Sequence, residues 1–90
     1  MQVFLHPSAR KHLERMNQTD RERIKKALRG LEKEPPEGNI RPYEGNPGIW
    51  RLKVGGYRVL YKIESAATIL ATHIEPRGQA YTKKTRSKRG

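Results

Sequence analysis

The sequence predicts an α+β domain in which an N-terminal hairpin of two helices packs on one face of a small, twisted antiparallel sheet. Between Pro7 and Pro35, apolar residues recur every three or four positions, as in amphipathic helices. Residues 35–48 are rich in proline and glycine and predict a loop. From Ile49 onward, apolar and polar residues alternate, as in half-buried strands. The predicted order of elements is β-α-α-β-β-β.

The first half of the chain predicts one strand and two helices. A short strand is expected at Gln2–Leu5, and the second helix is expected to begin at a capping box that runs from Thr19 to Glu22. Gly30 should weaken this helix by about 1 kcal/mol relative to alanine. The apolar stripes that we expect to be buried are Ala9, Leu13 and Met16 in the first helix and Ile24, Ala27, Leu28 and Leu31 in the second.

Length and charge limit the possible functions. The chain has 90 residues and a mass of 10.4 kDa, which is enough for one core. We expect one domain over residues 1–81 and a basic, disordered tail over residues 82–90. The net charge of +11 and the pI of about 10.5 point to a polyanionic partner, either nucleic acid or an acidic protein. The tail, with Lys83 and Lys84, would add sequence-independent affinity for phosphates.

Other features exclude several kinds of chemistry and predict a location. The chain has no cysteine, which excludes a thiol nucleophile and a cysteine-ligated metal. The longest early apolar run, Val3–Leu5, is too short for the core of a signal peptide, and no stretch approaches the ~18 apolar residues of a membrane helix. We therefore expect a soluble cytoplasmic protein that does not bind a membrane. We expect no metal and no small-molecule cofactor.

A two-residue turn determines the register of the central hairpin. Gly55–Gly56 is typical of a type I′ turn and would place Lys53 directly opposite Arg58. Like charges across a strand pair repel, so this arrangement suggests an anion between them. Strand alternation sends the following residues toward the helices: Trp50, Leu52, Val54, Tyr57, Val59, Tyr61 and Ile63. The other face carries Arg51, Lys53, Arg58 and Lys62.

The last hairpin would enlarge this basic face. If Ile63 pairs with Thr68, His73 falls opposite Arg58, and Arg77 and Tyr81 follow near the same place. Two interpretations remain open: an anion-binding site and a solvated basic face. Tyr43, in the predicted loop, either contacts RNA or packs within the loop. The face as predicted has no carboxylate, which argues against a metal-dependent nuclease.

Two segments resemble the RelE/ParE toxin superfamily, particularly archaeal-type RelE. The run Trp50–Tyr61 (WRLKVGGYRVLY) resembles the central hairpin of that superfamily, and Glu75–Tyr81 (EPRGQAY) resembles the end of the domain. With the preceding strand and helical hairpin, the resemblance covers residues 1–81. The chain departs from the best-studied bacterial members in two respects. Arg51 stands where they have lysine, and the spacing between Arg77 and Tyr81 is shorter.

The resemblance implies the toxin of a type II toxin–antitoxin system. In the RelE branch, the toxin enters the ribosomal A site and cleaves mRNA without a metal by attack of the 2′-hydroxyl on the phosphodiester. The implied partners are the ribosome, mRNA and an acidic, RelB-like antitoxin. The implied catalytic residues are Lys53, Arg58, Arg77 and Tyr81, and Arg51 is a further basic position that the resemblance implies. From the predicted basic face and tail, we expect Lys62, His73, Lys83 and Lys84 to bind RNA together with Arg51.

The residue that would accept the 2′-hydroxyl proton is open among three candidates. Tyr81 would need nearby cations to lower its pKa from the ordinary value of about 10. Lys53 could serve if neighbouring positive charges favour its neutral form. His73 is the third candidate, because imidazole exchanges protons near neutral pH. Three alternative functions also stay open: a ParE-like toxin that binds gyrase without nuclease activity, a non-catalytic protein that binds RNA or the ribosome, and a degenerate toxin.

Overall fold

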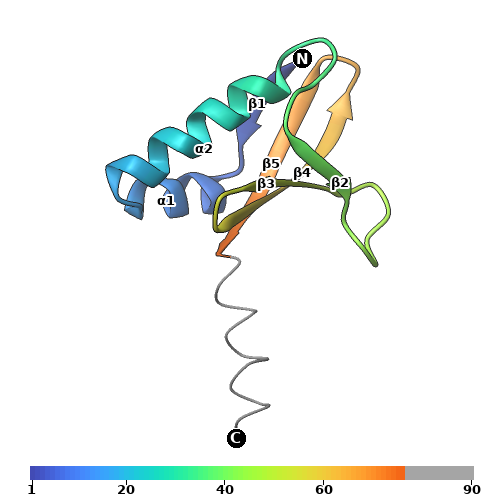
Figure 1. Cartoon of the computed structure of the whole chain (residues 1–90). Helices are drawn as coiled ribbons and strands as arrows, with labels where there is room; N and C mark the ends of the chain where they lie inside the picture. Colours follow the sequence, from blue (N-terminus) through green and yellow to red (C-terminus); the bar gives the residue numbers. More distant parts are fainter. Residues whose placement is uncertain (77–90) are drawn as a thin grey trace, which may run out of the picture.

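The computed structural model describes residues 1–76, so Arg77, Tyr81, Lys83, Lys84 and the expected domain boundary at residue 81 lie outside the described residues. Two helices and five strands make up the described part (Figure 1). Their bounds are β1 Gln2–Leu5, α1 Pro7–Arg15, α2 Gln18–Leu31, β2 Asn39–Pro42, β3 Trp50–Val54, β4 Tyr57–Ser65 and β5 Thr68–Pro76.

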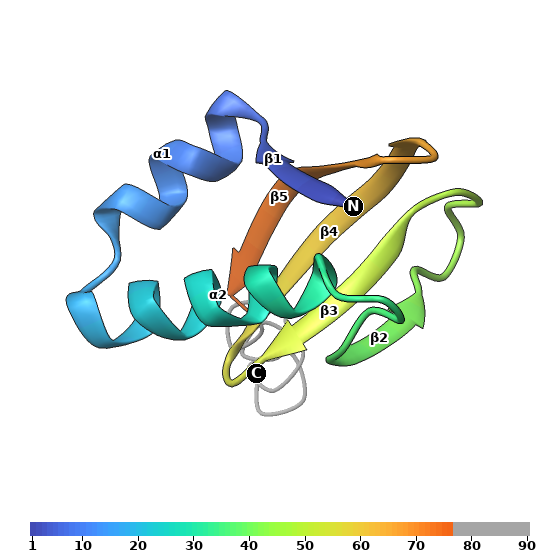
Figure 2. The ribbon, with the colours of Figure 1, turned by 90° about the horizontal axis from the view of Figure 1, so that it is seen from above.

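The sheet is mixed, with the strand order β1-β5-β4-β3-β2 (Figure 2). β1 runs parallel to β5, whereas the other neighbours are antiparallel. The prediction of a purely antiparallel sheet was therefore wrong. The two helices intervene between β1 and the other strands, and this long connection allows a parallel pairing that a tight turn cannot make.

β2 is a strand that the sequence did not predict, because residues 35–48 were interpreted as a loop. It pairs with β3 at the edge of the sheet, where Pro42 stands opposite Trp50. Proline is tolerated on an edge strand, since its missing N–H can face away from the ladder. Ile40 packs against the core and fixes which face of β2 points inward. The order of elements is therefore β-α-α-β-β-β-β.

Both helices lie on the same face of the sheet (Figures 1 and 2). The predicted stripes are confirmed: all of their members are buried except Ala27, which is partly buried and packs against the core. From the sheet, the core receives Leu52, Val59, Tyr61, Ile69, Ala71 and Ile74. The opposite face carries no helix in the described part of the chain, and we call it the open face.

The start and the end of α2 differ from their predictions. Asn17, not Thr19, is the N-cap, and its Oδ1 accepts a hydrogen bond of 2.9 Å from the backbone N–H of Asp20. Near the other end, the carbonyl of Gly30 accepts a bond of 2.9 Å from the N–H of Glu37. A Cβ at Gly30 would lie 2.9 Å from the carbonyl oxygen of Glu37. Gly30 therefore permits the close return of the chain after α2.

The central hairpin has the predicted register. Val54 pairs with Tyr57, and Lys53 pairs with Arg58. Gly55, in the turn, has a φ of +56°, a conformation that glycine adopts without steric cost. The predicted inward set is also confirmed except for Ile63, which is 51% exposed.

The second hairpin differs from its predicted register. Ser65, not Ile63, pairs with Thr68, and Ile63 pairs with Ile69. A second irregularity follows, since Tyr61 pairs with Ala71 but Leu60 pairs with His73, which leaves Thr72 without a partner in the ladder. The Thr72 hydroxyl donates to the carbonyl of Leu60 at 3.3 Å. These shifts place Glu75, not His73, opposite Arg58.

Candidate anion-binding site on the open face

Two rows of side chains cross the open face. The first row consists of Asn39, Lys53, Arg58 and Glu75, each paired with the next across neighbouring strands. The second row consists of Arg41, Arg51, Leu60 and His73. Alternation places both rows on the open face, because the intervening Leu52, Val59 and Ile74 belong to the core. Leu60 is only 6% exposed and is an apolar member of a largely cationic surface.

Arg58 has charged neighbours on both sides. Lys53 is its partner on β3, as predicted, and Glu75 is its partner on β5. Nη2 of Arg58 lies 3.5 Å from Oε1 of Glu75. The prediction of a face without a carboxylate was therefore wrong. Glu75 offsets part of the repulsion between Lys53 and Arg58, so the protein supplies one counter-ion itself.

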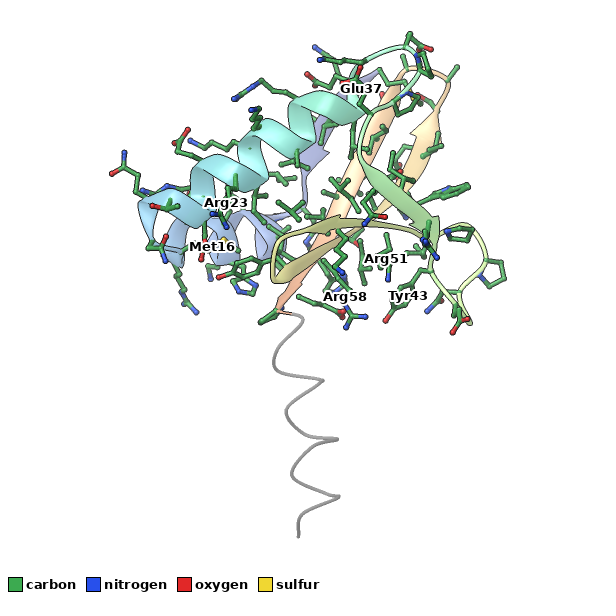
Figure 3. All side chains as sticks on the ribbon, viewed as in Figure 1. Met16, Arg23, Glu37, Tyr43, Arg51 and Arg58 are labelled. Atoms are coloured by element: carbon green, nitrogen blue, oxygen red, sulfur yellow. The ribbon has the colours of Figure 1, made fainter. Side chains whose placement is uncertain are left out.

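Three arginines line one cavity beside these rows. The cavity has a volume of about 470 Å³, and its lining residues are Arg41, Pro42, Tyr43, Glu44, Arg51 and Arg58. The labelled side chains Tyr43, Arg51 and Arg58 lie on the same side of the sheet (Figure 3). The Nε atoms of Arg51 and Arg58 are buried and lack a hydrogen-bond partner. A buried donor without a partner is costly. The guanidinium groups of the three lining arginines can donate to an anion in this cavity.

Arg41 is a site residue that the sequence analysis missed. It stands directly opposite Arg51 on the neighbouring strand and lines the same cavity. Like charges at this position are destabilising, so Arg41 adds a second unfavourable pair to the one formed by Lys53 and Arg58. The alternation of Ile40 with Arg41 was the only sequence signal, and it is too short to predict a strand.

Two other predicted RNA-binding residues lie on the open face, away from this cavity. Lys62 pairs with Leu70 in the ladder and forms an ion pair of 3.2 Å with Glu64. His73 stands opposite Leu60, and its Nδ1 lies 3.1 Å from the hydroxyl of Thr72. The expected contact of His73 with Arg58 is therefore not formed.

Two tyrosines in the central hairpin belong to the side that packs against the helices. The hydroxyl of Tyr57 donates to Oδ2 of Asp20 at 3.1 Å. Burial and then the adjacent Asp20 carboxylate raise the pKa of Tyr57 above its ordinary value, and burial likewise raises the pKa of Tyr61. Both phenols therefore hold their protons more tightly than a free tyrosine does.

The comparison with protein families matches residues 3–81 to the model of the ParE toxin of type II toxin–antitoxin systems, parDE. The chain belongs to the ParE toxin family. Solved structures with a similar fold include RelE toxins of the same RelE/ParE superfamily. The comparison with curated protein sequences finds no match.

The toxin is similar to RelE in an archaeal RelE–RelB complex from Pyrococcus horikoshii, with 26% identity and a TM-score of 0.71 over 87% of this chain and 96% of that one. It also resembles a chain of the RelBE2 toxin–antitoxin complex of Mycobacterium tuberculosis, with 20% identity and a TM-score of 0.71 over 84% and 96% of the two chains. For the isolated RelE toxin of Escherichia coli, the identity is 21% and the TM-score 0.69 over 96% of each chain.

Two further findings concern the described part of the toxin. Neither helix within residues 1–76 is long and apolar enough to span a membrane. Over the same residues, no three histidine or acidic side chains come together in a group that could hold a metal ion.

Proposed function

We propose that the toxin is a ribosome-dependent mRNA endoribonuclease that cleaves in the A site without a metal. The convergence of Arg41, Arg51 and Arg58 on one cavity, where two buried Nε atoms lack partners, carries the proposal. Such a cluster is suited to hold a phosphodiester and to stabilise the extra negative charge of a pentacoordinate phosphate. The similarity to RelE structures supports the same assignment.

In this reaction the 2′-oxygen of the RNA attacks the adjacent phosphorus, and the bond from phosphorus to the 5′-oxygen breaks. The products are a 2′,3′-cyclic phosphate and a 5′-hydroxyl. Lys53, Arg58 and Arg77 are the proposed catalytic cations, and Arg51 binds the RNA with Lys62, His73, Lys83 and Lys84. One proton leaves the 2′-hydroxyl and one joins the leaving 5′-oxygen, so the site also needs a proton carrier.

Tyr81, Lys53 and His73 remain the candidates for the proton carrier. His73 lies one row away from Arg58, beside Leu60, and its ring contacts the Thr72 hydroxyl. Lys53 is the cross-strand neighbour of Arg58 and therefore lies nearer to the proposed phosphate. A proton carrier that is poorly matched on the protein alone suits an enzyme whose substrate is arranged by the ribosome.

The proposed partners are the ribosome, its mRNA and an acidic, RelB-like antitoxin. The net charge of +11 supports the association with polyanions and with an acidic protein. The similar RelE toxins from Pyrococcus horikoshii and Mycobacterium tuberculosis were solved in complexes with antitoxins. Cytoplasmic location is part of the proposal, because these partners are found there.

The decisive experiment incubates the purified toxin with programmed ribosomes and end-labelled mRNA, with and without EDTA. We expect A-site cleavage that survives EDTA and falls by at least about a hundredfold in Arg58→Ala. Arg15→Ala, an exposed position on α1, is the matched control and should cleave at the wild-type rate. Intact mRNA in the presence of confirmed ribosome binding would refute the nuclease, and cleavage that stops in EDTA would refute the metal-independent reaction.

The match to the ParE family model favours a second candidate, a toxin that binds gyrase and has no nuclease activity. Inhibition of DNA supercoiling by purified gyrase, together with intact mRNA in the ribosome assay, would support this function instead. A third outcome, ribosome binding that Arg58→Ala only weakens and no cleavage by either variant, would indicate a non-catalytic RNA-binding protein.

A further inference from the structure

The cavity on the open face contains more than phosphate-binding groups. Its arginines come from β2, β3 and β4, whereas Pro42, Tyr43 and Glu44 come from the end of β2 and the segment after it. A phosphate needs only the cations. An aromatic ring, a proline ring and a carboxylate in the same wall match the other parts of a nucleotide, since bases stack on aromatic rings and their amino groups donate to carboxylates.

The size of the cavity agrees with a ligand as large as a nucleotide. Its volume of about 470 Å³ lies within the roughly 300–1,000 Å³ that is usual for small-ligand sites. Arg41, Arg51 and Arg58 line the cavity and supply the guanidinium groups that would hold the phosphate. Tyr43 and Arg51 line the same cavity, so one ligand could contact the ring and the guanidinium together.

The segment that carries Tyr43 and Glu44 is held in place by backbone hydrogen bonds. The N–H of Tyr43 donates to the carbonyl of Ile49 at 2.9 Å, and the N–H of Ile49 donates to the carbonyl of Asn46 at 3.1 Å. A third bond, from the N–H of Asn46 to the carbonyl of Tyr43, measures 3.3 Å. A segment that is already ordered loses little entropy on binding, which favours recognition of one ligand shape.

Glu44 has acceptor oxygens available for a ligand. Over residues 1–76, the ion pairs involve other carboxylates, namely those of Glu22, Glu37, Glu64 and Glu75. The side chain of Glu44 also forms no hydrogen bond within that range. A carboxylate is an acceptor only, so it attracts an amino group on a base and repels a carbonyl at the same position.

We propose that Pro42, Tyr43 and Glu44 form a base-recognition subsite that selects a base with an exocyclic amino group. This subsite rests on the proposed function, since it would take a base of the RNA whose phosphate the arginines hold. Tyr43 stacks on the base, and the carboxylate of Glu44 accepts from the amino group. Cytosine and uracil are the sharpest test pair, because they share size and shape and differ chiefly in an amino or carbonyl group at position 4.

The test measures binding to the free, ¹⁵N-labelled toxin by NMR titration, without ribosomes and without cleavage. The probes are cytidine 5′-monophosphate, uridine 5′-monophosphate and ribose 5-phosphate, which share the phosphate and the sugar. We expect the cytidine nucleotide to bind about three- to tenfold more tightly than the uridine nucleotide. Both nucleotides should bind more tightly than ribose 5-phosphate and should shift the amide signals of residues 42–49.

Four variants assign the roles. Glu44→Gln should bind the two nucleotides within about twofold of each other, because an amide can donate as well as accept. Tyr43→Leu should weaken both by at least about fivefold and leave ribose 5-phosphate unchanged, whereas Tyr43→Phe should bind like the wild type. Glu64→Gln removes the same charge away from the cavity and should preserve the preference for cytidine.

Two results would overturn the subsite: equal binding of the three probes, or a cytidine preference that persists in Glu44→Gln. Neither depends on catalysis. If the nucleotides are discriminated but programmed ribosomes keep their mRNA intact, the subsite stands and the endoribonuclease is refuted. If mRNA is cleaved but the free toxin does not distinguish the bases, the nuclease stands and the subsite is refuted.

Discussion

Arg58 and Glu75 face each other across β4 and β5, with Nη2 of the arginine 3.5 Å from Oε1 of the glutamate. The arginine side chain is 25% exposed and the carboxylate side chain 37%. An anion that binds Arg58 must therefore share the guanidinium with a carboxylate of the protein. Nε of Arg58 is buried and remains without a partner, so Glu75 satisfies only part of this side chain.

Replacement of Glu75 by glutamine should strengthen RNA binding. Removing the carboxylate leaves Arg58 free to donate to phosphate, and we expect uncleavable 2′-O-methyl RNA to bind about two- to fivefold more tightly near 0.1 M salt. Fluorescence anisotropy measures the change, which should largely disappear in 1 M salt because free ions screen it.

Glu22→Gln provides the matched control for this prediction. It makes the same change in net charge, and Glu22 pairs with Lys25 on α2 rather than with a residue of the open face. We expect Glu22→Gln to change RNA affinity less than twofold. Equal gains in the two variants would show that net charge alone, and not the contact with Arg58, accounts for the effect.

Tyr57→Phe should lower the free energy of unfolding. It should also make this free energy vary less with pH above 9. The hydroxyl of Tyr57 donates to Asp20, and loss of this bond should cost about 0.5–1.5 kcal/mol of unfolding free energy at pH 7. Burial and Asp20 raise the pKa of folded Tyr57, so its contribution is fully present below the unfolded pKa of about 10 and is lost as the pH rises through the folded pKa.

Urea unfolding at several pH values tests this prediction. The difference between wild type and Tyr57→Phe should be constant from pH 7 to 9 and should shrink above pH 10. Tyr61 titrates in both proteins and therefore cancels in the comparison. A double-mutant cycle with Asp20→Ala isolates the pair, and a coupling energy of zero would contradict the contact.

Gly30→Ala should destabilise the toxin even though alanine favours a helix. The intrinsic preference would add about 1 kcal/mol of stability in an isolated helix. The new Cβ would, however, lie 2.9 Å from the carbonyl oxygen of Glu37, and this backbone cannot move without disturbing its hydrogen bond to Gly30. We expect a net loss of about 1–3 kcal/mol of unfolding free energy.

Gly56→Ala is the corresponding control, because a Cβ at Gly56 meets no atom within 4 Å. The unfolding free energy of this variant should change by less than about 1 kcal/mol. An increase in the melting temperature of Gly30→Ala would show that the chain after α2 can move away, and that the close approach to Glu37 is not required.

Much of the fold follows from local sequence. The apolar spacing placed Leu13, Ile24 and Leu28 in the core, because a helix must bury its apolar face whatever it packs against. The Gly55–Gly56 turn fixed the pairing of Lys53 with Arg58, because a two-residue turn leaves the adjoining strands a single register. The sequence by itself therefore determined the fold class and the two central cations of the open face.

The tertiary structure decided the remainder of the described site. β2 became a strand only through its pairing with β3, and this pairing brings Arg41 beside Arg51. The two arginines are distant in the sequence, so a local sequence pattern does not predict that they are neighbours. Ser65 instead of Ile63 pairs with Thr68, and Thr72 drops out of the ladder. Together these two shifts place Glu75 instead of His73 opposite Arg58. Such irregularities depend on how the whole sheet packs against the helices, so a local pattern cannot specify them. Two one-residue shifts in register exchanged a histidine for a carboxylate beside the central arginine.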